Sequence, residues 1–475
     1  MTRETYHDVL TRRSFLDTCA AGLGTVGLAH LMGVDGSAAV TQGNSAAAQG
    51  PHFAPRAKNL IFLFMAGAPS QIDLFDPKPN LKRWHGEALP PSMTKDLKLA
   101  FIKPTAKVLA SPRSFSHCGQ SGMEISDYLP NLQQVADDIC LVRSMQTGQV
   151  NHHPGQSMLM SGSPLVGRPA MGAWLSYGLG TESQDLPGFV VLSSGRGASG
   201  GSSNFSSGFL PSTYAGVPFR KSGDPILYLS NPDPVSRDSQ RLSLETLRRL
   251  NEEKLQRSGD PQVAARMANY ELAFRMQASA PELLDFSDES QSTKDSYGIG
   301  QDPTSAYGTN CLMARRMVER GVRVVMLIHA SWDDHTNLDE GLKKNCDITD
   351  KPVAALLGDL KQRGLLDETL VVWGGEFGRT SLGQLKHVGD KVGRDHHPNG
   401  FSMWLAGGGT KGGHVMGSTD ELALTAEKDP VHVHDLQATI LHLMGLDHER
   451  LTYRHMGRDF RLTDVSGEVV DQILA

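Results

Sequence analysis

The segment Thr369-Leu-Val-Val-Trp-Gly-Gly-Glu-Phe-Gly-Arg-Thr380 indicates the fold of this chain. Residues 369–373 are continuously apolar, which is typical of a strand buried on both faces of a parallel sheet. Glu376 follows at the carboxyl end of this predicted strand, and Gly393-Arg-Asp-His-His-Pro398 is predicted to be a loop that brings an Asp and two His to the same edge. Ligands of open α/β sheets bind at that edge. The segment therefore predicts a metal or ester-binding site there.

The rest of the chain repeats the alternation of apolar strands and amphipathic helices. Further strands are predicted at 59–65, 139–145, 322–328 and 401–406, and helices at 127–136, 310–320, 352–362 and 435–444. Such an alternation predicts an α/β fold, with helices on both faces of a mostly parallel sheet.

The N-terminus has the features of an export signal. Thr11-Arg-Arg-Ser-Phe-Leu16 precedes an apolar run at 20–32, and small residues follow at 38–39 and 46–48. This order predicts a twin-arginine signal peptide and linker over residues 1–48, recognised by the twin-arginine export machinery. A periplasmic or extracellular location is expected. No later segment reaches 18 consecutive apolar residues, so we expect no transmembrane segment in the mature chain.

Composition narrows the possible partners. The 475 residues carry a formal net charge of -6, and the 46 Lys and Arg are scattered along the chain, which argues against a nucleic-acid partner. Residues 192–230 are rich in Gly, Ser and Pro but contain aromatic residues, so an ordered loop over the site is favoured over a linker. Together with a predicted helical cap from 234 to 284, this loop forms an expected insertion at 192–300.

Four polar clusters follow predicted strands or precede predicted helices. They are Asp73 with Asp76, Asn151-His152-His153, Trp332-Asp333-Asp334-His335 with Asn337, and Glu376 with Asp395-His396-His397. Loops at one edge of a parallel sheet converge in space. Carboxylate and imidazole groups are ligands for zinc, manganese or iron, whereas carboxylates with amides suit calcium or magnesium. A divalent metal, zinc or calcium, is therefore the expected cofactor.

Each cluster also has a structural interpretation. In the first cluster, Asp73 or Asp76 would cap a helix or close a turn. In the second, His152 and His153 would bond to the backbone at the start of a helix. The 333–335 run is then a solvated loop, and Glu376 forms a structural ion pair with Arg379 or Arg394.

Two resemblances follow from these motifs. The stretch 366–378 resembles the strand of sulfatases and alkaline phosphatases that ends in a metal motif, with Glu376 at the position of their metal-binding Asp. Almost the whole mature chain resembles a family of exported bacterial proteins in that superfamily, common in planctomycetes. Its marks here include Trp-Asp-x-His at 332–335, Gly-Glu-Phe-Gly-Arg-Thr at 375–380 and Gly-Ser-Thr-Asp at 417–420. The resemblance implies an alkaline-phosphatase-like domain over residues 56–475.

The sequence departs from the superfamily pattern at three places. Ala66 and Gly67 stand where sulfatases carry an Asp pair, His152 stands at the nucleophile position, and Phe377 replaces a second ligand. Asp73 is considered as a replacement for the Asp pair. The predicted metal ligands are Asp73, Asp333, His335, Glu376, Asp395, His396 and His397.

The expected activity is hydrolysis of sulfate or phosphate esters of small molecules or polysaccharides, by a metal that activates water. His152 or His153 is the alternative nucleophile or general base. Arg379 or Arg394 is expected to orient an anionic oxygen of the substrate. The alternative function, from another class, is a non-catalytic protein that binds an anionic glycan or another exported protein through the same edge.

Overall fold

The computed structural model describes residues 50–475 except 96, 98, 196, 221–225, 227–228, 233 and 385–390. The predicted signal peptide and linker, residues 1–48, lie outside the described residues. A nine-stranded sheet has the order β12-β4-β11-β8-β1-β7-β5-β6, and β15 also pairs with β4. Its strands are β1 (Asn59–Ala66), β4 (Ile139–Gln146), β5 (Phe189–Gly195), β6 (Val217–Pro218), β7 (Val324–Ala330), β8 (Thr369–Gly374), β11 (Phe401–Ala406), β12 (His414–Met416) and β15 (Val431–His432).

Strand β11 is the one described strand of this sheet that runs against the others. It pairs antiparallel with both β4 and β8, and every other pairing in the sheet is parallel. The prediction of an α/β fold with a mostly parallel sheet is therefore confirmed. Because β1, β4, β7 and β8 run in the same direction, their carboxyl ends lie at one edge.

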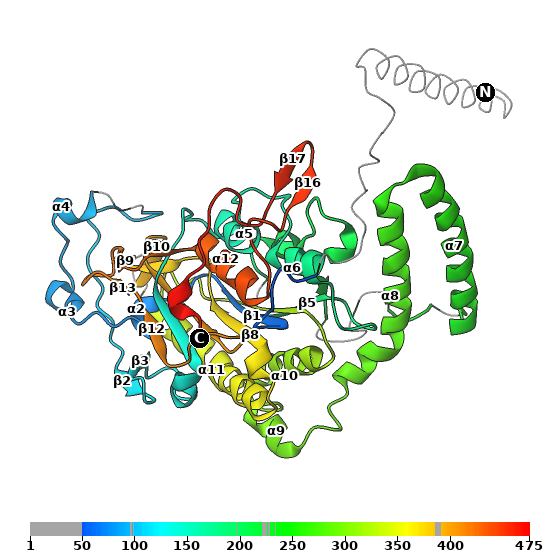
Figure 1. Cartoon of the computed structure of the whole chain (residues 1–475). Coiled ribbons are helices and arrows are strands. Elements are labelled where there is room, and N and C mark those ends of the chain that lie inside the picture. The colour runs from blue at the N-terminus through cyan, green and yellow to red at the C-terminus, as the bar shows by residue number, and fades with distance from the viewer. Residues whose placement is uncertain are drawn as a thin grey trace, which may run out of the picture. The chain divides into compact units, whose positions relative to one another are not determined.

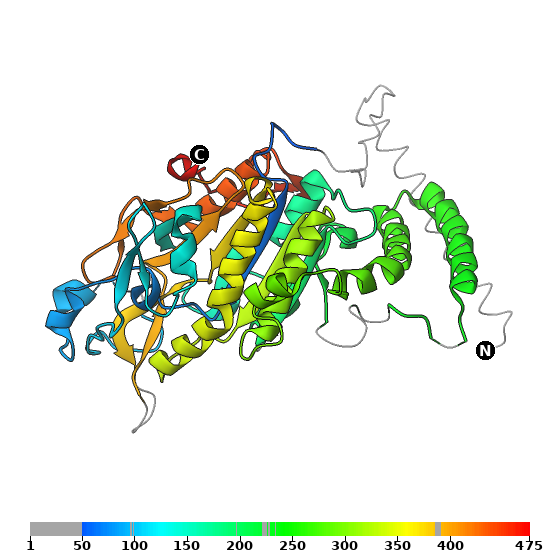
Figure 2. The same cartoon turned by 90° about the horizontal axis from the view of Figure 1, so that it is seen from below.

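Strand β1 is buried on both faces, which explains why its sequence is apolar without alternation. Its residues 60–65 are fully buried; Leu60 and Phe62 contribute to one core cluster and Ile61 and Leu63 to the other. Helices α5 (His152–Ser161), α6 (Met171–Leu179) and α12 (Val433–Leu443) contribute to the first cluster. Helices α10 (Ser305–Glu319) and α11 (Leu338–Gln362) contribute to the second, and they cross the face of the sheet seen in Figure 2. Both faces of the sheet are thus covered by helices.

The remaining helices and strands lie outside the large sheet, with α7 and α8 side by side at one end (Figure 1). The helices are α2 (Gln71–Leu74), α3 (Leu81–Trp84), α4 (Pro91–Thr94), α7 (Arg237–Ser258), α8 (Pro261–Leu284) and α9 (Gln291–Ser296). Two-stranded sheets pair β2 (Phe115–Cys118) with β3 (Met123–Ser126), β9 (Gly378–Gln384) with β10 (Gly393–His397), β13 (Ser418–Thr419) with β14 (Ala426–Lys428), and β16 (Tyr453–His455) with β17 (Arg458–Phe460). The predicted helical region 234–284 corresponds to α7 and α8.

Two predicted helices differ from the structure. The helix expected at 352–362 begins at Leu338 and contains Pro352 in its interior. Proline in a helix costs about 3 kcal/mol, but the buried apolar face of α11, which includes Leu342 and Leu356, offsets this cost. The helix expected at 127–136 is instead a 3-10 segment, η1 (Leu132–Asp138), whose backbone is interrupted at Val135. Its late start agrees with Pro130, because a proline disfavours helical backbone at the residue before it.

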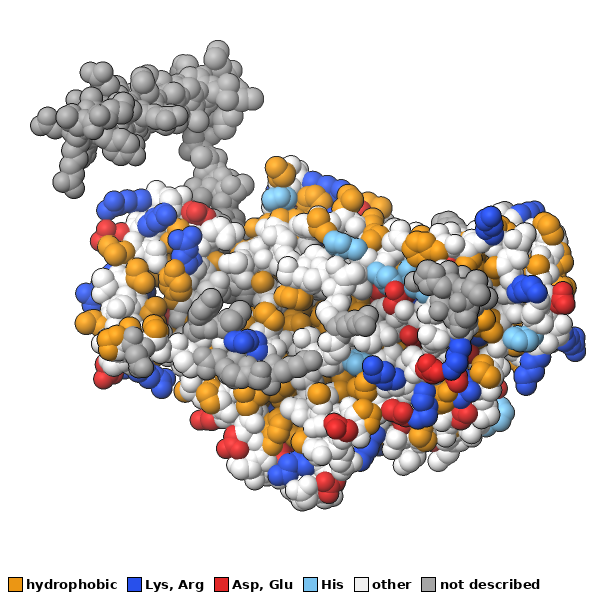
Figure 3. Space-filling model, turned by 180° about the vertical axis from the view of Figure 1, so that it is seen from behind, with side chains coloured by type: hydrophobic (Ala, Val, Ile, Leu, Met, Phe, Trp, Pro, Cys, Tyr) orange, Lys and Arg blue, Asp and Glu red, His pale blue; other side chains and the backbone are white. Residues whose placement is uncertain are grey.

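Two further features of the described residues are the distribution of surface charge and the character of the long helices. On the face shown in Figure 3, Lys and Arg side chains are interspersed with acidic and apolar ones. Within the described part of the chain, we found no helix with the length and apolar character needed to span a bilayer.

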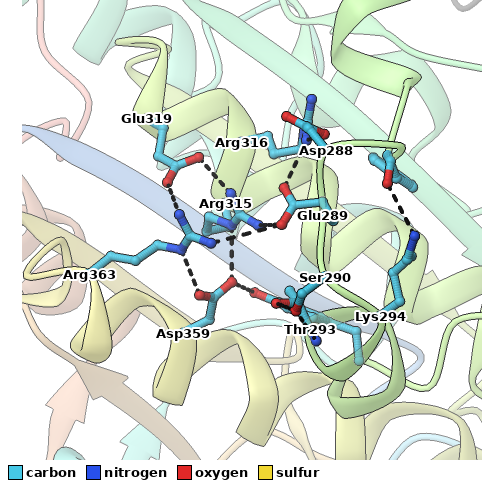
Figure 4. A network of polar contacts seen from close by, with 12 residues as sticks. Asp288, Glu289, Ser290, Thr293, Lys294, Arg315, Arg316, Glu319, Asp359 and Arg363 are labelled. Atoms are coloured by element: carbon cyan, nitrogen blue, oxygen red, sulfur yellow. Dashed lines mark hydrogen bonds and ion pairs between the residues drawn. The ribbon is translucent and has the colours of Figure 1, made fainter.

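A buried ionic network ties the segment after α8 to helices α10 and α11 (Figure 4). The Arg315 guanidinium lies 2.7 Å from Glu289, 2.6 Å from Glu319 and 3.0 Å from Asp359. Arg316 contacts the same Glu289 at 2.7 Å. Only 2% of the Arg315 side chain is exposed, so loss of its charge leaves buried carboxylates without a partner.

We predict that Arg315→Ala lowers the free energy of unfolding by about 3–5 kcal/mol, the usual cost of removing one partner of a buried ion pair. The matched control is Arg249→Ala, because Arg249 contacts Glu245 but is 74% exposed. Its expected cost is about 0.5 kcal/mol or less. Denaturant unfolding of both variants measures the difference, and equal costs would contradict the structural role of the network.

Candidate metal centre

The carboxyl ends of four parallel strands supply the candidate site. Gly67 directly follows β1, His152 begins α5 after β4, Asp333 and His335 follow β7, and Glu376 follows β8. These residues come from segments that are far apart in the sequence but meet at one edge of the sheet, as expected for codirectional strands.

The segment that supplies His396 is a strand, which corrects the loop expected at 393–398. Residues 393–397 form β10, which pairs antiparallel with β9 and carries a register shift between Arg394 and His396. Successive side chains of a strand point to opposite sides. His396 accordingly reaches the cluster, whereas His397 is buried away from it.

Three imidazoles surround one carboxylate oxygen. The distances from Asp333 Oδ1 to the Nε2 atoms of His152, His335 and His396 are 3.1, 2.9 and 3.3 Å. The four candidate ligand atoms of this cluster lie within 4.8 Å of one another. A group of this size and composition is able to surround a single cation.

The other nitrogen of each ring is bonded to an acceptor. The Nδ1 contacts are Glu376 Oε1 at 2.7 Å for His152, Gln384 Oε1 at 2.6 Å for His335, and the Val150 carbonyl at 2.7 Å for His396. Because these oxygens accept, each Nδ1 carries a hydrogen, and each ring, when it is neutral, presents its Nε2 lone pair to the cluster. This is the usual tautomer of metal-bound histidine, which donates its second N–H to a carboxylate or carbonyl.

The Nε2 atom of His152 provides an independent test of whether the cluster fits a cation. It is buried and has no partner of hydrogen-bond geometry, although it lies 3.1 Å from Asp333. Buried polar atoms without partners are costly and uncommon. A cation bound by His152, Asp333, His335 and His396 would satisfy this atom, so the residues present fit a metal ion.

Glu376 lies behind the cluster rather than in it, which differs from its predicted role as a ligand. It is fully buried, and its Oε1 accepts hydrogen bonds from the Gly67 N–H at 3.1 Å and from Gln156 Nε2 at 2.9 Å. With His152 as the third partner, Glu376 is oriented toward α5. Gln156 was not predicted, although its spacing of four residues from His152 places both on one helix face.

Gly67 lies where the turns after β1 and β7 meet. Its φ is +110°, and a Cβ at this position would lie 2.7 Å from the backbone nitrogen of Asp333. The turns after β1 and β7 therefore approach too closely for any side chain at position 67.

Arg379 positions Asp333 instead of facing solvent. Its Nη2 lies 2.6 Å from Asp333 Oδ1, and its other donors bond to backbone carbonyls, including that of Ala68 at 3.0 Å and that of Arg394 at 3.1 Å. The side chain is fully buried. Its donors contact protein groups, and the expectation that Arg379 orients a substrate oxygen stays a prediction.

Arg394 and Asp73 form a separate buried ion pair. Arg394 Nε lies 2.8 Å from Asp73 Oδ2, and its Nη1 donates to the Leu109 carbonyl at 2.9 Å. Burial opposes ionisation of Asp73, but Arg394 outweighs it and lowers the pKa of this carboxyl. Asp73 is therefore used as a structural partner and does not replace the missing Asp pair, and Arg394 does not face a substrate.

Three other predicted residues lie outside the cluster. Asp395 is buried, and its Oδ2 accepts the N–H groups of Phe101 and Ile102 at 2.8 and 3.1 Å. His397 is fully buried, and burial lowers its pKa to about 4. His153 is exposed on the first turn of α5.

The rings of Phe377 and Phe101 pack against the three imidazoles. The ring of Phe377 lies 5.1 Å from that of His152 and 4.7 Å from that of His396, between centroids. The ring of Phe101, which is 61% exposed, lies edge-on 5.4 Å from His396. Phe377 thus packs against two of the imidazoles of the cluster.

The charges of the cluster are unequally distributed. Burial opposes ionisation of Asp333, but the three imidazoles and Arg379 hold the pKa of its carboxyl far below the usual range. Burial also opposes protonation of His152, but its close contacts with the carboxylates of Asp333 and Glu376 raise its pKa to about 9. Burial lowers the pKa of His396, whose Nδ1 faces a neutral carbonyl. The excess proton of the metal-free cluster therefore resides on His152.

A cavity of about 430 Å³ opens beside the cluster. Its lining includes His152, Asp333, Asp334, Gln156 and Lys344, together with residues 197–199 of the Gly-rich segment. Burial raises the pKa of Asp334 to about 7. The volume lies in the range of small-molecule sites, and 43% of the Asp333 side chain is exposed. The cluster is thus accessible to a small ligand.

The chain was compared with protein families, curated proteins and solved structures. Residues 57–474 match the family model described as "Protein of unknown function (DUF1501)". No match was found among curated proteins. Similar solved structures include the PsFucS1 sulfatase from Pseudoalteromonas sp., with 13% identity, 83% of this chain and 69% of that chain covered, and a TM-score of 0.36. A protein in the alkaline phosphatase superfamily from Vibrio parahaemolyticus has 10% identity, coverage of 84% and 69%, and a TM-score of 0.33. At these values the similarity identifies no shared chemistry.

We predict a pH-dependent stability of the metal-free protein that arises from His152. Its folded pKa of about 9 exceeds the unfolded value of 6.5, so its contribution is complete below pH 6.5 and is lost as pH rises toward 9. The free energy of unfolding should fall by up to about 3 kcal/mol over this window. Denaturant unfolding in chelator should show this fall for wild type and for His153→Gln, but not for His152→Gln. An unchanged profile for His152→Gln would contradict the assignment.

Proposed function

The chain belongs to the DUF1501 family of proteins of unknown function, and we propose that it is an exported, zinc-dependent hydrolase of sulfate or phosphate esters. The observation that carries this proposal is the convergence of three imidazole Nε2 atoms on one oxygen of Asp333. Export is inferred from the twin-arginine pattern at 11–16.

The donor set favours zinc over calcium. Three imidazoles and one carboxylate match the nitrogen and oxygen ligands of zinc, and iron and manganese accept the same groups. Calcium takes six to eight oxygen ligands, which this cluster does not provide. Of the two metals expected from the sequence, zinc is therefore the one we propose.

The residues around the centre support hydrolysis. A divalent cation in such a site supplies Lewis acidity and allows water to ionise near neutral pH. Glu376 accepts the Nδ1–H of His152 and so keeps Nε2 available as a ligand. Arg379 fixes Asp333, and the adjacent cavity admits the ester group. Sulfate or phosphate esters of small molecules or of polysaccharides are the proposed substrates.

A second candidate function is binding without turnover. Gly67 and Phe377 occupy positions where sulfatases carry metal ligands, and Phe377 packs on His152 and His396. The cluster therefore offers ligands for one cation, and His152, which stands at the nucleophile position of the superfamily, is one of those ligands. A metal-loaded chain that turns over no ester would be an anionic-glycan or protein-binding relative.

We predict that the purified chain contains about one zinc ion per molecule and hydrolyses aryl sulfate or aryl phosphate in a chelator-sensitive manner. His335→Ala and His396→Ala should lose both metal and activity, whereas the exposed His153→Ala should keep both. Elemental analysis and a panel of aryl esters measure these outcomes. Stoichiometric metal in His335→Ala, or turnover unaffected by chelator, would refute the proposal.

We also predict that Glu376→Gln weakens zinc binding by about 10–100-fold, the usual effect of removing the partner of a metal-bound histidine. The neutral amide keeps the shape but no longer stabilises the Nδ1–H of His152. Competition with a zinc-binding dye measures the affinity. A direct ligand role of Glu376 would instead abolish stoichiometric binding.

A further inference from the structure

The polar donors of the cavity are mostly used by protein groups. Gln156 Nε2 donates to Glu376 at 2.9 Å, and Asn345 Nδ2 donates to the Ser331 carbonyl at 3.0 Å. The Ser331 hydroxyl donates to the Ala330 carbonyl. Each of these groups thus has at least one hydrogen engaged by a protein acceptor, and none of them carries a charge.

Lys344 is different, because its ammonium group has no acidic partner among the described residues. It lies on α11, lines the cavity and is exposed. Its neighbour Lys343 is 2.5 Å from Asp347 in an i,i+4 ion pair and does not line this cavity. Of the two adjacent lysines, Lys343 is paired on the helix surface, whereas Lys344 lines both this cavity and a more open hollow beside Asp339.

The cavity joins this cation to the candidate centre. His152 and Asp333 line the same space as Lys344, and its apolar lining is limited to the alanine side chains at 66, 198 and 330. A small, polar space that contains a lysine and borders a cation site suits a compact anion better than an apolar group. The exposed ring of Phe101 lies outside this lining, against His335 and His396.

We propose that Lys344 binds the anionic sulfuryl or phosphoryl group of the substrate in this cavity, and so selects esters that carry a negative charge. This inference rests on the proposed ester hydrolysis. Lys344 is a specificity-determining residue, since its ammonium group forms a charge-assisted hydrogen bond with a nonbridging oxygen of the ester.

Binding of inorganic sulfate and inorganic phosphate to the zinc-loaded full chain tests the proposal by calorimetry. Lys344→Gln should weaken binding of at least one anion by about tenfold, the effect of losing one charged hydrogen bond. Lys344→Arg should restore most of the affinity, and Lys343→Gln, the matched control, should change it by less than about twofold. Zinc content is measured for every variant and should be unchanged.

The outcomes separate this inference from the proposed function. Equal anion affinity in wild type and Lys344→Gln, with zinc bound in both, overturns the role of Lys344 but leaves hydrolysis standing. Absence of anion binding to the zinc-loaded wild type also overturns it. If zinc does not bind, the proposed function fails, while a Lys344-dependent anion affinity of the metal-free chain still supports the anion site.

Discussion

The arrangement of the site depends on the hydrogen bonds that fix the outer nitrogen of each imidazole. Since Glu376, Gln384 and the Val150 carbonyl accept from Nδ1, the Nε2 lone pairs of neutral rings face the anionic oxygen of Asp333. Lone pairs and an anionic oxygen within 3.3 Å repel unless a cation lies between them. Protonation of His152 supplies part of that charge. A divalent cation would supply it without three separate protons.

Buried charged side chains hold the turns around the site in place. Arg379 bonds to carbonyls of the turns after β1 and β7 and to Asp333. Arg394 joins Asp73 to the β9–β10 hairpin. Buried ion pairs contribute little net stability but are costly to break, so they favour one arrangement of the loops. The ion pairs around Arg315 are also buried and costly to break, and they lie where the helical insertion joins the rest of the fold.

Structural features that depend on local sequence, such as buried strands, are predictable from the sequence. Continuous apolar runs at 59–65 and 369–373 indicated strands buried on both faces, and the site was expected at their carboxyl ends. The start of α11 at Leu338 was missed because Pro352 suggested a boundary that tertiary packing overrides. Neighbouring histidines were not distinguishable from sequence, because a register shift in β10 decides whether His396 or His397 faces the cluster.

The roles of charged residues depend on distant partners, which limited the sequence prediction of the site. Glu376 has the position of a metal ligand, yet Gly67 and Gln156 draw its carboxylate behind His152. Asp73 and Arg394 are 321 residues apart and form an ion pair that no local pattern indicates.

X-ray absorption spectroscopy of the zinc-loaded chain tests the central claim most directly. The account predicts three imidazole nitrogens and one carboxylate oxygen at about 2.0–2.2 Å from the metal. A coordination shell of oxygens alone, or one without imidazole scattering, would contradict it.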